Sequence, residues 1–328
     1  MWFRPVVVLL LAAGLDFALG DPWGWPHPVR AMGWLIARGQ RAIFDLKLTP
    51  RGDRLGGVVL GLGVIGLSGG LGWGLVAIAH RIAPGLGLLV EVVLLASCWA
   101  GRSLRRAAEE VLEPLERGDL ATARDRLGWY VGRDTDNLDE AEILRAVMET
   151  ISENATDGVM APLFYALLGS LTPLGPVPLA LAYKAASTLD SMVGYREPPY
   201  TDLGWFSAQF EDRLTWVPCR LTVITLALLS CQPRRVLALC RRDAPADPSP
   251  NAGWSECAYA AALGVQLGGV NTYRGQPKEK PLLGEALRPI TAERIRRGMA
   301  LTRWATLLWL TLGLGGIATF SILGLAPW

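Results

Sequence analysis

Two clusters of polar residues flank a long uncharged stretch in the middle of this chain of 328 residues. The first cluster contains Glu153 and Asp157, and the second contains Lys184 and Asp190. Glu153 and Asp157 have helical spacing and should lie on one face. A carboxylate pair can hold a hydrated Mg²⁺ that also carries substrate phosphates, and lysine is a point charge for phosphate. The alternative is a solvated helix start with a lysine that reaches up to the membrane surface.

The second cluster has a helical period of its own. Lys184, Ser187, Thr188 and Ser191 stand at positions i, i+3, i+4 and i+7. This spacing predicts a polar stripe along one helix. Ionisable groups at membrane depth are usually functional, so the stripe is a candidate wall of a binding site.

The stretch that must position both clusters runs from residue 158 to 183 without a charged side chain. As a straight helix it would be about 39 Å long, enough to cross a bilayer. Pro173, Pro176 and Pro178 interrupt it, and proline breaks helices. We therefore expect two half-helices that turn back, with their irregular backbone covered by protein or a cavity. This fold-back would bring the four charged residues of the two clusters into one site.

The composition indicates a membrane protein. The chain is 51% hydrophobic, with a mean hydropathy of +0.29, and soluble domains are less apolar. A net charge of +2 argues against a nucleic-acid partner. Five cysteines without CxxC spacing fit reduced structural thiols, and two histidines make His-rich metal chemistry and a His-based triad improbable.

We predict an all-α, polytopic helical membrane protein, with one integral membrane domain over residues 1–328. The predicted membrane segments cover about 3–20, 55–79, 84–100, 158–183 (broken by prolines and re-entrant-like), 214–232 and 304–327, and the predicted cytoplasmic helical segments cover about 101–157 and 233–303. Residues 55–79 and 84–100 should form a helical hairpin. Arg and Lys fill the long polar segments, which places these segments in the cytoplasm by the positive-inside rule.

Two formal glycine motifs carry no function here. Gly61 to Gly66 reads GxGxxG, and Gly66 to Gly70 reads GxSxG. Neither lies in the βαβ or strand-turn-helix context that these motifs require. The glycines instead predict close helix packing, with Gly57/Gly61 and Gly70/Gly74 at the GxxxG spacing.

A proline-rich segment near the N-terminus holds a further candidate site. Asp21, His27 and Arg30 could converge there on a ligand. Three prolines favour an extended or turning backbone. The alternative is an interfacial loop anchored by Trp23 and Trp25.

Further charged residues suggest phosphate or metal binding. Arg133 and Asp134 follow a glycine turn and could bind phosphate and metal, or could form a surface ion pair. Glu211 and Asp212 are a second acidic pair, close before a predicted membrane entry. Arg220 would be buried near the interface and would need a partner.

A loop at Ser249-Pro-Asn251 leads into a predicted helix. Ser249 or Asn251 could cap this helix, and a helix N-terminus binds phosphate readily. Glu256 should lie in its first turns.

Several uninterrupted blocks of sequence resemble one family. They read GDPWGWPHPVRAMG, AGRSLRRAAEEV, YVGRDT, ISENATDGVMAPLFYALLG, AYKAASTLDSMVGY, SPNAGWSE and ALGVQLGG. In this order they resemble the adenosylcobinamide-phosphate synthase family of cobalamin biosynthesis, the CobD/CbiB family. The resemblance runs from about residue 10 to beyond 290. Residues 1–20 also look like a cleaved signal peptide, but the family pattern continues through Asp16 to Arg30, which favours a retained first helix.

The resemblance implies a multi-pass enzyme of the bacterial inner membrane whose active site faces the cytoplasm. It implies a ligase that attaches (R)-1-amino-2-propanol O-phosphate, or aminopropanol, to the free propionate carboxylate of adenosylcobyric acid. ATP as a substrate and Mg²⁺ would be required, and we expect an acyl phosphate intermediate. The chain contains no GxxxxGK[ST] sequence, so a nucleotide site would be of another kind.

The chain departs from the usual family pattern at several positions. Gln209 stands where the family has Arg, Glu211 replaces an Asp, and Thr215 stands where Asn is frequent. Ser187 replaces Asn, and Asp247 replaces a His before Ser-Pro-Asn. Gln209 and Asp247 lose cationic or proton-transfer options, which puts a role for those two positions in doubt.

We expect the following roles in the family's reaction. Metal and nucleotide phosphates would be held by Glu153, Asn154, Asp157, Glu211 and Asp212; phosphate would be neutralised by Lys184 and Arg133; the substrate cleft and its phosphate would be lined by His27, Arg30, Thr188, Asp190, Ser191, Arg220 and Asn251. Asp157 or Asp190 would assist deprotonation of the amine.

The partners expected are the corrinoid, the aminopropanol (phosphate), the lipid bilayer and, as a further prediction, a second copy of the chain or other cobalamin-pathway enzymes. Two other classes of function stay open. A broken helix flanked by ion-binding groups is also found in secondary transporters, although no inverted repeat is present here. A membrane scaffold for pathway enzymes is the third alternative. Nucleotide turnover separates the ligase from both.

Overall fold

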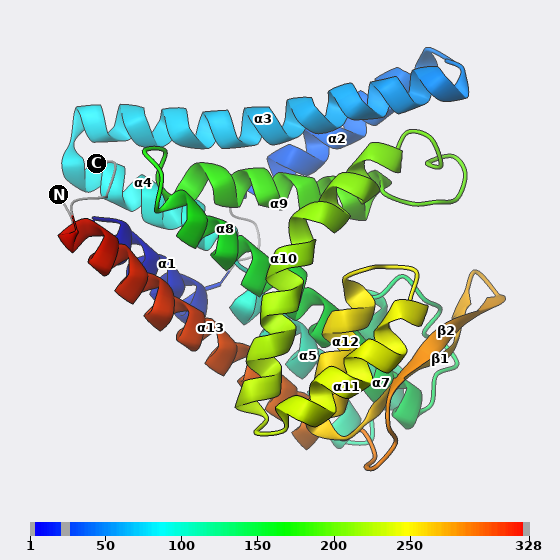
Figure 1. Cartoon of the computed structure of the whole chain (residues 1–328). Coiled ribbons are helices and arrows are strands. Elements are labelled where there is room, and N and C mark those ends of the chain that lie inside the picture. The colour runs from blue at the N-terminus through cyan, green and yellow to red at the C-terminus, as the bar shows by residue number, and fades with distance from the viewer. Residues whose placement is uncertain (1–3, 21–26, 324–328) are drawn as a thin grey trace. The chain divides into compact units, whose positions relative to one another are not determined.

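The structure is a computed structural model, and it describes residues 4–20 and 27–323 (Figure 1). In chain order its elements are α1 (Arg4–Ala18), α2 (Pro28–Asp45), α3 (Pro50–Ile82), α4 (Pro84–Ala96), α5 (Gly101–Glu116), α6 (Leu120–Gly128), α7 (Glu140–Ala155), the π-helix η1 (Thr156–Met160), α8 (Ala161–Gly169), α9 (Pro176–Val193), α10 (Trp205–Leu229), α11 (Pro233–Asp243), the 3₁₀-helix η2 (Ala244–Ala246), α12 (Ala252–Leu263), β1 (Gln266–Tyr273), β2 (Gln276–Gly284) and α13 (Ala292–Ile322). Asp21 and the outer ends of the first and last predicted membrane segments lie outside the described residues.

The chain divides into two compact units. Unit 1 comprises Met1–Ala100, Ala161–Thr215 and Trp309–Trp328, and unit 2 comprises Gly101–Met160 and Trp216–Leu308. The single integral membrane domain predicted from the sequence stays a prediction.

The predicted fold-back of the central stretch in unit 1 is confirmed. Helices α8 and α9 lie side by side and run in opposite directions (Figure 1). The rings of Tyr165 and Tyr183 stack between them, with centroids 5.0 Å apart. Gly175 makes the turn with a φ of +80°, which favours glycine. Pro176 then starts α9, where a missing N–H costs nothing.

The hairpin predicted from residues 55–79 and 84–100 is confirmed as α3 and α4, which are joined at Ala83 and pack together. The glycine prediction is half right. A methyl group on Gly57 would clash with the Leu203 carbonyl, and one on Gly61 would clash with the Phe206 ring. The Gly70/Gly74 prediction was wrong, because both positions face open space.

The prediction of a helical membrane protein is confirmed. Among the described residues, α3 and α13 are long and apolar enough to cross a membrane, and α4 with α5, bent by 41°, would make a third span if taken as one. The other predicted membrane segments fall on α1, on the α8–α9 hairpin and on α10. All five cysteines are free and four are buried, as expected of reduced structural thiols.

Unit 2 has a hydrophobic core with residues from α5, α6, α7, α10, α11, α12, the strands and the start of α13. The N-terminus of α7 is fixed by a capping box between Asp139 and Glu142. The antiparallel hairpin of β1 and β2 was not predicted. Arg274 and Gly275, both with positive φ, form its two-residue turn, which fits the twist of paired strands.

Candidate active site

A buried carboxylate, Glu149 on α7, is the centre of a polar network in unit 2. It accepts hydrogen bonds from the guanidinium groups of Arg133 and Arg145. It also accepts from the backbone N–H of Gly268 at 2.9 Å. Although burial opposes ionisation, the two arginines and Lys280 hold the pKa of Glu149 below its usual range. Glu149 is therefore a charged residue that fixes two cations.

The β-hairpin supplies the other side of this network. A bulge lies between Leu267 and Gly269, and Gly268 adopts a φ of +89° there. The bulge directs the Gly268 N–H to Glu149, while the Gly268 carbonyl accepts from Arg145 at 2.9 Å. Bulges often occur beside active sites, where they redirect groups.

The loop that contains Arg133 is held on the hairpin. Asn271 Oδ1 accepts from Arg133 at 2.8 Å. Asp134 accepts from the backbone N–H groups of Arg274 at 3.0 Å and Gly275 at 2.7 Å. Asp134 thus caps the hairpin turn. The sequence suggested that Asp134 binds a ligand or forms a surface ion pair, whereas these two bonds are made with backbone N–H groups. Arg133 pairs with the buried Glu149 and is only 9% exposed.

Beside this network lies a lysine between carboxylates. Lys280 Nζ on β2 donates to both oxygens of Glu256 on α12, at 2.7 and 2.8 Å. Glu256 is completely buried, and burial raises its pKa to about 8 despite Lys280. Glu153 is half-buried. Burial also raises the pKa of Glu153, and Asp247 and Glu149 add to this effect while Lys280 opposes it.

The end of α7 carries the next two predicted site residues. Asn154 is exposed and its Nδ2 donates to the Thr150 carbonyl at 2.9 Å. Asp157 is half-buried and lies in the π-helix η1. Single π-helical turns inside a longer helix are frequent at functional sites. Glu153 and Asp157 thus lie in one continuous helical segment, and their predicted place on a common face stays a prediction because the π-helix changes the period there.

The loop before α12 is fixed by its own polar groups. Ser249 Oγ accepts from the backbone N–H of Asn251 at 3.3 Å and of Ala252 at 3.1 Å, so Ser249 provides the predicted cap. Asn251 is buried at the N-cap position, without a side-chain capping bond. Arg220 donates to the Pro250 carbonyl at 2.9 Å.

Arg220 has the partners that the sequence required. Its guanidinium lies over the rings of Trp254 and Trp216, at 4.3 and 5.1 Å from their centroids. Its Nη1 atom is buried without a hydrogen-bond partner among the described residues. The phosphate-binding role of Arg220 stays a prediction.

Two blocks about a hundred residues apart in sequence meet in unit 2. Ser255 Oγ donates to the Ser152 carbonyl at 2.6 Å and lies 2.7 Å from Thr156 Oγ1. These contacts join ISENATDG to SPNAGWSE. Through Glu149, the same end of α7 is joined to YVGRDT by Arg133 and to ALGVQLGG by Gly268.

The polar stripe predicted on α9 is present in unit 1. Lys184 and Asp190 are half-buried, Thr188 is buried and Ser191 is exposed. Thr188 Oγ1 donates to the Lys184 carbonyl at 2.7 Å, and Ser191 Oγ donates to the Thr188 carbonyl at 3.0 Å. Both hydroxyl groups therefore keep only acceptor capacity for a substrate.

The second acidic pair lies on α10, beside α9. Glu211 is buried and accepts from the Thr215 hydroxyl and from Tyr183 at 3.4 Å. Asp190 and Asp212 are close enough for their charges to repel that of Glu211. Three carboxylates and Lys184 thus come from the facing helices α9 and α10.

Two other predicted substrate residues lie at α2. His27 Nδ1 accepts from the Val29 backbone N–H at 3.2 Å and caps the helix. Arg30 is exposed in the first turn. The cap gives His27 a structural role at the start of α2. Binding of substrate by His27 or Arg30 stays a prediction.

The predicted site residues are divided between the two units. Glu153, Asn154 and Asp157 belong to unit 2, whereas Lys184, Asp190 and Glu211 belong to unit 1. Their convergence stays a prediction. Within the described ranges 4–20 and 27–323, no three His, Cys, Asp or Glu side chains are grouped to hold a metal ion. Mg²⁺ usually needs only one or two carboxylates besides phosphates and water. The pair Glu153/Asp157 or the pair Glu211/Asp212 could provide these carboxylates.

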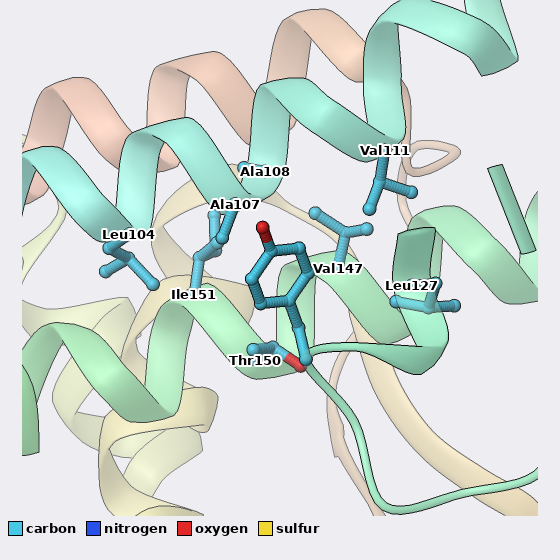
Figure 2. Close-up of a pocket in the computed structure, with 9 residues that line it drawn as sticks. Leu104, Ala107, Ala108, Val111, Leu127, Val147, Thr150 and Ile151 are labelled. Atoms are coloured by element: carbon cyan, nitrogen blue, oxygen red, sulfur yellow. The ribbon is translucent and has the colours of Figure 1, made fainter. Parts of the chain in front are cut away.

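Unit 2 also contains a pocket whose lining is mostly apolar, in contrast to the polar network around Glu149. Figure 2 shows that it lies between α5 and α7. Its lining residues are Leu104, Ala107, Ala108, Val111, Leu127, Tyr130, Val147, Thr150 and Ile151. The Tyr130 hydroxyl is already bound to Glu110. With so few polar groups, the pocket does not suit a phosphate or a nucleotide.

Sequence reasoning missed several members of the network. Glu149, Arg145, Asn271 and Lys280 were not predicted as site residues, and Glu256 was only placed in a helix. Their partners are far away in sequence, and the hairpin that brings them together was not predicted. One signal was present in the sequence. Arg145, Glu149 and Glu153 stand at intervals of four residues, which predicts that they share one face of α7.

Comparison with known proteins supports the family resemblance of the sequence. The family profile described as CobD/Cbib protein matches residues 9–302. "Cobalamin biosynthesis protein CobD" of Synechocystis sp. is 53% identical, over 94% of this chain and 92% of the relative. The protein of the same name from Klebsiella pneumoniae is 46% identical, over 92% of this chain and 94% of the relative.

"Cobalamin biosynthesis protein CbiB" of Salmonella typhi is 43% identical, over 95% of this chain and 99% of the relative. No solved structure matches the chain. A match of this extent leaves no large part of the described chain outside the family pattern. The chain therefore belongs to the CobD/CbiB family of cobalamin biosynthesis proteins.

Proposed function

We propose that this cobalamin biosynthesis protein is an amide-forming ligase. It would join (R)-1-amino-2-propanol O-phosphate, or aminopropanol, to the free propionate carboxylate of adenosylcobyric acid, with consumption of ATP. The observation that carries the proposal is the meeting of four sequence blocks around α7 in unit 2. Charged groups of both signs that are buried together, with shifted pKa values, are typical of functional sites.

The chemistry requires activation, because a carboxylate is a poor acyl donor to an amine. In the proposed reaction the propionate oxygen attacks the γ-phosphorus of ATP, and the bond to ADP breaks. The amine nitrogen then attacks the acyl carbon, and phosphate leaves as the amide forms. The ammonium proton must first be removed, and Asp157 and Asp190 are the proposed acceptors.

Phosphoryl transfer is mostly positioning and charge neutralisation. The proposed cations for this task are Lys184 on α9 and Arg133 beside α7. Mg²⁺, when bound, would neutralise phosphate charge, and the acidic pairs Glu153/Asp157 and Glu211/Asp212 are the groups that could hold it. The proposed location is the inner membrane, with the reaction on the cytoplasmic side.

The proposal is tested with purified protein in detergent. Adenosylcobyric acid and Mg-ATP are combined with either amine, and the corrinoid product is identified by mass. The proposed site predicts that Asp157→Asn and Lys184→Ala abolish product and ADP release. The exposed residues Asp136 and Lys47 provide matched controls, and Asp136→Asn and Lys47→Ala should keep activity.

Three outcomes separate the explanations. Product that persists in both site variants would keep the ligase and overturn the assigned site. No product and no nucleotide turnover with either amine would overturn the ligase. Uptake of a corrinoid into vesicles without turnover would then favour a transporter, whose half-helices the α8–α9 hairpin resembles.

A further inference from the structure

We propose that the outward face of α2 binds the head groups of anionic phospholipids. Trp34, Arg38 and Arg41 are exposed on this helix at intervals of four and three residues, so they form one line. We call them the α2 stripe. The Arg38 guanidinium lies 4.6 Å from the centre of the Trp34 ring, and Trp34 is 55% exposed.

The opposite face of α2 is anchored, which fixes the stripe in its outward direction. Met32 and Ile36 are buried. Gly33 lies beside Met192 of α9, and Gly39 lies against Leu60 of α3. Rotation of α2 would expose this apolar face, so the stripe cannot turn inward.

The chemistry of the stripe fits a phosphate-bearing surface. Arginine presents a planar fork of donors that matches phosphate oxygens. Tryptophan prefers the membrane–water interface, where one part of its ring is apolar and the N–H is wet. The one acidic residue of α2 is Asp45, its last residue, which lies one turn beyond Arg41 on the same line, so the stripe of Trp34, Arg38 and Arg41 is cationic and aromatic and ends at this carboxylate.

The position of α2 favours a bilayer over a soluble anion. It packs along the first half of α3, a helix long and apolar enough to cross a membrane. Close to this contact, α3 changes from charged residues such as Arg51 to an apolar run that begins at Leu55. Leu46, Leu48 and Leu55 are exposed there. Cations beside exposed leucines are expected where head groups meet acyl chains.

The test uses the full chain in detergent, with lipid binding measured by native mass spectrometry. Phosphatidylglycerol is the anionic probe, and phosphatidylcholine is the probe without net charge. A charge-assisted contact between an arginine and a phosphate strengthens binding by about tenfold or more, so Arg38→Gln with Arg41→Gln should weaken phosphatidylglycerol binding by at least about tenfold. Binding of phosphatidylcholine should stay unchanged.

The matched control removes two charges elsewhere. Arg234 and Arg241 are exposed on α11, and Arg234→Gln with Arg241→Gln should leave phosphatidylglycerol binding at the wild-type level. An equal loss in the control pair would show a net-charge effect and overturn the proposal. Full competition by inorganic phosphate would also overturn it, because the stripe would then be a site for a free anion. If the double variant does not fold, Arg38→Gln alone should still weaken phosphatidylglycerol binding, and wild-type binding in it would overturn the proposal.

Discussion

Loss of the Glu149 carboxylate should destabilise unit 2 strongly. This side chain is only 2% exposed. It accepts from Arg133, from Arg145 and from the Gly268 N–H, which belong to three separate segments. Without it, Arg133 and Arg145 lose the buried carboxylate that both of them bind.

The magnitude follows from the burial of the partners. Arg133 is 9% and Arg145 is 15% exposed, so water can replace the carboxylate only in part. Removal of one partner of a buried ion pair costs about 3–5 kcal/mol. For a unit of this size we expect Tm to fall by roughly 6–20 °C in Glu149→Gln.

The assay is thermal unfolding of the detergent-solubilised protein, with hydrogen exchange at the Gly268 amide as a local measurement. Exchange at Gly268 should accelerate, because the neutral amide oxygen of glutamine is a weaker acceptor than the carboxylate. Glu279 is exposed on the same hairpin, and Glu279→Gln is the matched control. A Tm loss in Glu149→Gln no larger than in this control would refute the argument.

The pH dependence has a defined sign. The pKa of Glu149 lies below the usual value of 4.5 in the folded protein. Its contribution to the free energy of unfolding is therefore complete above pH 4.5 and is lost as the pH falls through the folded pKa. Below pH 4.5, the difference in stability between wild type and Glu149→Gln should shrink, and a constant difference would contradict this assignment.

Three further changes test particular contacts. Asp134→Ala removes the cap of the exposed hairpin turn, so unit 2 should lose about 0.5–1.5 kcal/mol and the Gly275 amide should exchange faster; unchanged exchange would contradict the cap. Gly57→Ala would place a methyl group against the Leu203 carbonyl and should lower Tm by several degrees, whereas Gly63→Ala meets open space and should leave Tm nearly unchanged; equal shifts would refute the packing argument. Lys184→Arg keeps the positive charge but replaces a compact ammonium group with a larger planar guanidinium. Because the proposed role of the Lys184 ammonium is close contact with a phosphate, ADP release should fall by more than tenfold, and wild-type turnover would contradict this role.

The sequence predicted those features that depend on neighbouring residues. Prolines at 173, 176 and 178 were sufficient for the α8–α9 fold-back, because proline limits the backbone wherever it occurs. The α9 stripe followed from helical spacing alone. The Gly70/Gly74 prediction failed for a related reason: the GxxxG spacing shows that a close approach is possible, but not that another helix is there.

The polar network of unit 2 could not be predicted in this way. Lys280 lies in a charged segment that reads like an exposed loop, and its partner Glu256 is 24 residues away on a helix. Glu149 binds Gly268 only because a bulge redirects that amide. Such contacts depend on tertiary pairing, for which a short window of sequence contains no signal.

One isotope measurement tests the proposed reaction most directly. Adenosylcobyric acid labelled with ¹⁸O in its free propionate carboxylate is incubated with the purified protein, Mg-ATP and aminopropanol phosphate. The proposed acyl phosphate predicts the amide product, one ¹⁸O atom in inorganic phosphate, and ADP. Label in AMP would contradict the acyl phosphate, and the absence of any corrinoid amide would contradict the ligase itself.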